Sequence, residues 1–70
     1  MDNEKRRERA QDIEYILADA EMELYYFKKV EGYSLSPEEL ETIIYVHSMV
    51  DLALRTMHFY NEEAQHEEEN

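Results

Sequence analysis

The stretch EGYSLSP at residues 31–37 holds the only glycine and the only proline of the 70-residue chain. Glycine and proline interrupt regular structure more often than other residues, so the chain is divided here and at no other point. Gly32 can adopt the left-handed conformation that closes a helix at its C-terminus. Ser36 and Glu39 flank Pro37 as a capping box, in which each side chain accepts a hydrogen bond from the other residue's backbone amide. The stretch therefore predicts the end of one helix and the start of another.

Apolar residues recur at intervals of three and four on both sides of this stretch, which is the spacing of one helix face. The first set is Ile13, Leu17, Ala20, Leu24 and Phe27, widened by Ile16 and Val30. The second set, interrupted by one histidine and one asparagine, is Leu40, Ile43, His47, Val50, Leu54, Met57, Asn61 and Ala64. We expect helices over about residues 4–31 and 37–62, a turn at 32–36 and a solvated acidic tail at 63–70.

The predicted fold class is all-α, with one domain over residues 1–70 folded as an antiparallel two-helix hairpin. A connection of only about five residues favours antiparallel packing of the helices that it joins. This topology brings four basic residues near the N-terminus beside five glutamates near the C-terminus. The basic residues are Lys5, Arg6, Arg7 and Arg9. We expect the two ends of the chain to neutralise each other in part.

Composition excludes several classes of protein. The chain has 18 acidic and 7 basic residues and a formal net charge of -11, which argues against binding to nucleic acid or to anionic membranes. It has no cysteine, so neither a disulfide framework nor a thiolate metal site is expected. No uncharged run approaches the roughly 20 residues of a bilayer span, and the charged N-terminus lacks the apolar segment of a signal peptide. We expect a soluble, cytoplasmic protein.

Both predicted helices carry more apolar side chains than one seam between two helices can cover. Those outside the seam are Tyr15, Met22, Tyr25 and Tyr26 in the first helix and Ile44, Tyr45, Val46, Met49, Leu52, Ala53, Phe59 and Tyr60 in the second. Domains of this size usually need disulfides, a metal or oligomerisation for stability. We therefore expect a homodimer in which two hairpins form a four-helix bundle. The alternative is that the second apolar face binds a different protein.

This pattern favours a small acidic regulator or adaptor that binds another protein and is not an enzyme. Its candidate contact residues are aromatic or apolar side chains grouped toward the turn: Tyr25, Tyr26, Tyr33, Tyr45 and Met49. No catalytic residue or cofactor is expected. The chain has no cysteine nucleophile, no glycine-rich phosphate loop and no serine–histidine–acid arrangement at a strained turn.

An acidic stretch in the first helix suggests an alternative function. It has no basic residue between Arg9 and Lys28 and consists of Asp12, Glu14, Asp19, Glu21 and Glu23. As one exposed face, these carboxylates would resemble a row of phosphates and would make the protein an inhibitor of a DNA- or RNA-binding protein. The same residues also suit a solvated helix face that keeps an acidic protein soluble.

The histidines leave a third possibility, a metal site in the bundle. The candidate ligands are His47, Asp51 and His58 with Asp19 or Glu23, and separately Glu63 and His66, which have the Glu-x-x-His spacing of di-iron bundles. A part-buried histidine satisfied by a neighbouring side chain explains His47 more simply. We therefore assign no metal ligand.

Overall fold

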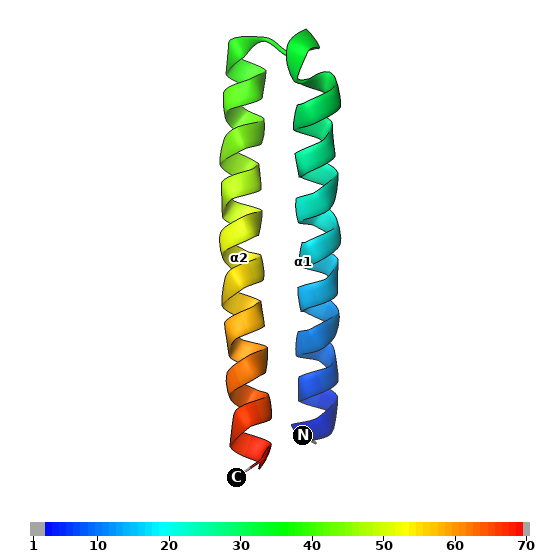
Figure 1. The fold of residues 1–70 in the computed structure, drawn as a ribbon, viewed down its shortest axis with the longest axis vertical. Coiled ribbons are helices and arrows are strands. Elements are labelled where there is room, and N and C mark those ends of the chain that lie inside the picture. The colour runs from blue at the N-terminus through cyan, green and yellow to red at the C-terminus, as the bar shows by residue number, and fades with distance from the viewer. Residues whose placement is uncertain (1–2, 70) are drawn as a thin grey trace.

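The computed structural model describes residues 3–69, and it describes the side chains of residues 3–66. Helix α1 (Asn3–Glu31) and helix α2 (Pro37–Glu69) are joined by the short 3-10 helix η1 (Gly32–Ser34). Figure 1 shows the two long helices side by side and antiparallel, with η1 at the closed end and both termini at the open end. The molecule measures 51 × 18 × 14 Å. The predicted all-α helical hairpin is confirmed.

The capping box at the start of α2 is confirmed in detail. The Ser36 amide donates to Oε1 of Glu39 at 2.9 Å, and the Glu39 amide donates to Oγ of Ser36 at 3.1 Å. The Leu40 amide then donates to the Ser36 carbonyl at 2.9 Å, which completes the first turn. Because the Glu39 carboxylate accepts from the Ser36 amide, the pKa of Glu39 is lowered. These bonds fix where α2 begins.

The end of α1 differs from the prediction for Gly32. None of the described residues has a positive φ, so Gly32 does not close the helix in the left-handed conformation. The chain instead tightens into η1, and Oγ of Ser34 donates to the Glu31 carbonyl at 2.9 Å. A 3-10 turn and a serine side chain can satisfy terminal helix carbonyls without reversing the sign of φ.

Helix α2 ends later than predicted, because it continues past residue 62 to Glu69. Asn70 lies outside the described residues. Glutamate, glutamine and alanine all have high helix propensity, and no residue in this segment breaks a helix. Ala64 also remains partly buried, so contact with α1 extends beyond the predicted end at residue 62.

The face of α2 that packs on α1 is the predicted one. Every residue of its set, from Leu40 to Ala64, is at least partly buried, and Asn61 is the most buried of them at 8% exposure. Over residues 3–69, neither long helix contains an apolar segment of the length needed to cross a bilayer.

The face of α1 that packs on α2 differs from the predicted apolar stripe. Apart from Ala18 and Ala20, which are also partly buried, its buried or partly buried positions follow a seven-residue repeat: Arg7, Ala10, Glu14, Leu17, Glu21, Leu24 and Lys28. Leu17 and Leu24 belong to both patterns, but Ile13 and Phe27 are 46% and 41% exposed. The helix is turned so that charged side chains, and not these two apolar ones, point toward α2.

We expect the Ser36→Ala substitution to lower the free energy of unfolding by about 1 kcal/mol, because the Glu39 amide loses its acceptor. Chemical denaturation followed by circular dichroism measures this change. Ser48→Ala is the matched control, since the Ser48 hydroxyl donates to the Ile44 carbonyl within α2 at 3.0 Å. The control is expected to change stability by less than about 0.5 kcal/mol. Equal losses in the two variants would contradict a specific role for the cap.

Candidate interaction surface

A polar layer near the middle of the hairpin joins the two helices through His47. Its Nε2 donates to Oε2 of Glu21 at 2.8 Å, and the side chains of His47 and Glu21 are 14% and 31% exposed. Asp51, the neighbour that the sequence suggested for this histidine, instead accepts from Arg55 on its own helix at 2.7 Å. His47 is thus satisfied by a carboxylate from α1.

A second polar layer lies closer to the open end and centres on Asn61. Its Nδ2 donates to the Ala10 carbonyl at 3.2 Å and to Oε1 of Glu14 at 2.7 Å. The other oxygen of Glu14 accepts from Nδ1 of His58 at 2.8 Å, and Nε2 of His58 lies 3.0 Å from Oε1 of Glu62. Both ring nitrogens of His58 therefore face carboxylates, an arrangement that suits the charged imidazolium.

The charges in this second layer stabilise one another. The hydrogen bond to Glu14 and then the attraction of Glu62 raise the pKa of His58. Hydrogen bonds from Asn61 and then from His58 lower the pKa of Glu14. Each shift favours the charged form of its group, so the layer links the helices by an ion pair that is hydrogen-bonded at both ends.

The pairing roles of Glu14 and Glu21 were not predicted from the sequence. The signal that could have found them is the spacing of charged residues in α1, where Arg7, Glu14, Glu21 and Lys28 recur every seven positions. A seven-residue repeat keeps one line of side chains facing a partner helix. The polar residues His47 and Asn61 in the α2 set were the complementary signal.

The five residues of the predicted acidic face do not share one surface. Glu14 and Glu21 point into the seam and are hydrogen-bonded to α2. The exposed members are Asp12, Asp19 and Glu23. Two of the five carboxylates are thus used to hold the hairpin together.

The predicted metal candidates are likewise dispersed. His47 and Asp51 have different partners, and His66 and Glu63 lie on an exposed part of α2. Among the described residues, no three histidine, cysteine or acidic side chains are grouped closely enough to hold a metal ion.

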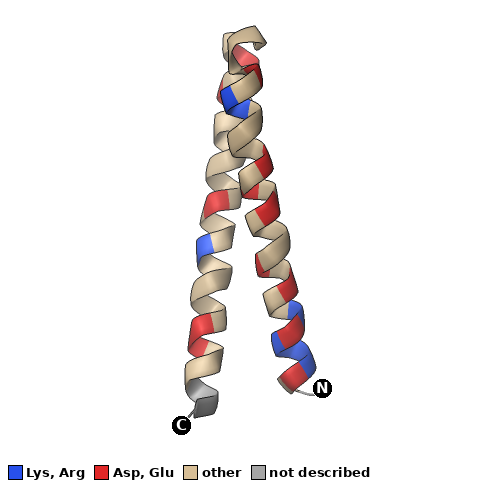
Figure 2. Ribbon diagram, turned by 45° about the vertical axis from the view of Figure 1, so that its right-hand side comes forward, with Lys and Arg blue, Asp and Glu red and all other residues tan. Residues whose placement is uncertain are grey.

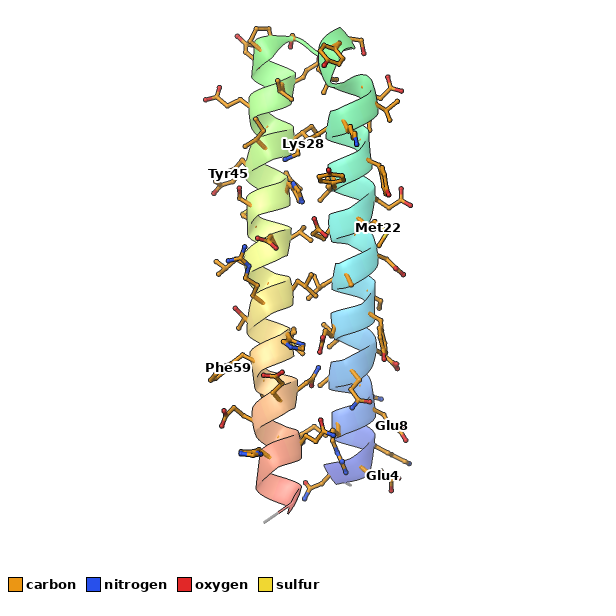
Figure 3. The ribbon with its side chains drawn as sticks, viewed as in Figure 1. Glu4, Glu8, Met22, Lys28, Tyr45 and Phe59 are labelled. Atoms are coloured by element: carbon orange, nitrogen blue, oxygen red, sulfur yellow. The ribbon has the colours of Figure 1, made fainter. Side chains whose placement is uncertain are left out.

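The structure brings together only part of the predicted tyrosine site. The rings of Tyr25 and Tyr26 meet edge to face with centroids 5.6 Å apart, and Nζ of Lys29 lies 5.9 Å from the Tyr25 centroid. Tyr33 is 99% exposed at the turn. Tyr45 points away from α1, as does Phe59 further along α2 (Figure 3). Met49 is also exposed on α2, at a position that belongs to one side of the hairpin described next.

The two sides of the hairpin that flank the seam differ in charge. The first, which we call the charge-poor flank, consists of Ile13, Ile16, Ala20, Glu23, Phe27 and Val30 on α1 and Thr42, Val46, Met49, Ala53, Thr56 and Tyr60 on α2. The second, the charged flank, consists of Gln11, Tyr15, Ala18, Met22, Tyr25 and Lys29 on α1 and Ile44, Ser48, Asp51, Arg55, His58 and Glu62 on α2. Glu23 is the one charged residue of the first set, whereas charges of both signs and a histidine lie in the second.

Surface hollows lie between the two helices on both sides of the hairpin. On the charge-poor side, one hollow is lined mainly by α1, through Phe27 and Val30 with Glu23 and Glu31 beside them, and by the seam residue Ile43 of α2. On the charged side, another is lined by Ala18 of α1 together with Arg55 and His58 of α2. Figure 2 shows uncharged stretches of α2 between charged residues at its ends and near its middle.

Comparison with models of protein families, with curated proteins and with solved structures gives no match.

We expect the His58 layer to stabilise the hairpin most between pH 4.5 and pH 6.5, the ordinary pKa values of its two groups. The pKa of His58 is raised in the folded hairpin. Its contribution to stability is therefore complete below pH 6.5 and is lost as the pH rises through the raised pKa. The pKa of Glu14 is lowered in the folded hairpin. Its contribution to stability is therefore complete above pH 4.5 and is lost as the pH falls through the lowered pKa. The measurement is the difference in melting temperature between the natural chain and His58→Gln across this range.

The control is the same His58→Gln change made in a Glu14→Gln chain, where most of the pH dependence of the difference is expected to vanish. A difference that stays constant from pH 4 to pH 9 in the natural background would contradict the ion pair.

Proposed function

We propose that this chain is a non-enzymatic regulator or adaptor that works by protein–protein contact, and that it does so as a homodimer in which two hairpins form a four-helix bundle. The observation that supports this proposal is the lack of a core in one hairpin. Among the residues whose side chains are described, Ala10 is the only apolar one that is buried, and no large side chain is fully buried. Large apolar side chains are instead exposed along both helices, Leu52 at 67% and Phe59 at 63% among them.

The exposed area has the size that a stable dimer needs. One chain exposes 5,915 Å², whereas a compact monomer of its 8.5 kDa mass exposes about 4,700 Å². The surplus of about 1,200 Å² per chain is within the range that each subunit buries in obligate homodimers, about 1,000–2,500 Å². Burial of this surplus by association would bring the area that each chain exposes down to the usual value for a compact chain of 8.5 kDa.

The polar side chains between the helices support a role in protein–protein contact and not in catalysis. The side chains of His47, His58 and Asn61 are held by hydrogen bonds to α1, so they serve the packing of the two helices. In the proposed dimer, Tyr25 and Tyr26 lie near the closed end and are candidates for contact with a further protein. Their edge-to-face packing presents two large rings with polar tips, which is a surface favoured at protein interfaces.

Sedimentation equilibrium at micromolar concentration tests the homodimer. The expected mass is twice the 8.5 kDa of one chain. The dimer is expected to persist when the salt concentration is raised, because burial of apolar surface is not screened by ions as charge–charge contacts are. A folded species that keeps the mass of a single chain at these concentrations would contradict the proposal.

A further inference from the structure

The asymmetry between the two flanks identifies the surface used for self-association. Large apolar side chains are exposed on both, so exposure alone does not distinguish them. Met49 on the charge-poor flank and Ile44 on the charged flank are 47% and 46% exposed. What differs is their surroundings, because Ile44 shares its flank with Asp51, Arg55 and His58, whereas Met49 lies among uncharged residues of α2.

The net charge of the chain makes this difference decisive for a second copy. Two chains that each carry a formal charge of -11 repel each other wherever their charged surfaces meet. Burial of unpaired charge in an interface adds a desolvation cost. Only a surface nearly free of charge lets two copies of this chain approach with little of either penalty, and Glu23 is the one charged residue of the charge-poor flank.

The shape and the rim of this flank also suit a second copy. Ala20 of α1 and Ala53 of α2 lie within it, between larger side chains, and small residues allow helices to approach closely. Toward the open end, the same side of the hairpin continues into Arg9 on α1 and Glu63 on α2, both exposed. A twofold pair presents the same surface from both subunits, so each copy offers a basic and an acidic rim residue to the other.

We infer that the charge-poor flank is the surface on which a second copy of this chain packs, and that the charged flank faces solvent in the dimer. This inference rests on the proposed homodimer and adds the surface that forms it. Val46, Met49 and Ala53 of α2 then pack, together with Ile13, Ile16 and Ala20 of α1, against the same set of residues in the other copy.

Two matched pairs of substitutions test the inference by sedimentation. Met49→Glu and Ile44→Glu place the same charge on the same helix at equally exposed positions of opposite flanks. Ala20→Glu and Ala18→Glu are the matched pair on α1. They place the same charge on opposite flanks, at two alanines that are both partly exposed. Met49→Glu and Ala20→Glu are expected to weaken the dimer by about 100-fold or more, and their controls by less than about threefold.

Each outcome has a separate meaning. If the natural chain is a monomer, the proposed homodimer fails. If the natural chain is a dimer but Ile44→Glu and Ala18→Glu weaken it as much as the other pair, or if all four variants stay dimeric, the homodimer stands and the assignment of the flank is overturned. A variant that cannot associate will also lose helix if the hairpin folds only as a dimer, so helicity is followed by circular dichroism at several concentrations. Helicity lost by Met49→Glu at low concentration and regained at high concentration, with Ile44→Glu unaffected, supports the flank.

Discussion

Two polar layers between the helices determine how α1 and α2 meet. One joins His47 to Glu21, and the other joins Asn61 to Glu14, which also binds His58. Sliding or rotating α1 would leave groups in both layers without partners, and a part-buried polar group without a partner costs free energy. Polar residues at such positions set register and orientation more than they add stability. The hairpin is therefore specified by its polar pairs as much as by its apolar contacts.

This constraint explains why the apolar stripe of α1 does not face α2. When Glu14 and Glu21 point into the seam, Ile13, Ile16 and Phe27 are carried to the side of the hairpin, where they are exposed. The seam is left with few apolar side chains and a thin interior, as expected when two helices alone must form a domain. The rotation that satisfies the polar layers thus creates the charge-poor flank. In the proposed homodimer, one hairpin is half of a folded unit, and a second copy completes its core.

Features that depend on one segment of the chain could be predicted from the sequence. The capping box is local to residues 36–39, and α2 has a single line of residues at helical spacing toward α1. Helix α1 contains two such lines of residues, one apolar and one a seven-residue repeat of charged residues. Which of the two faces α2 is determined by the polar groups on α2. The end of α2 was missed because glutamates that favour solvent also favour a helix. The charge-poor flank depends on the rotation of both helices, which no single stretch of sequence specifies.

The orientation of α1 is tested most directly by nuclear magnetic resonance on an equal mixture of isotope-labelled and unlabelled chains, which separates contacts within a chain from contacts between chains. The methyl groups of Leu17 and Leu24 are expected to contact α2 of their own chain. Those of Ile16 and Ala20 are expected to contact methyl groups of the other copy. Contacts from Ile16 and Ala20 to Leu54 of their own chain, with none between chains, would contradict both the polar seam and the surface that it leaves for a second copy.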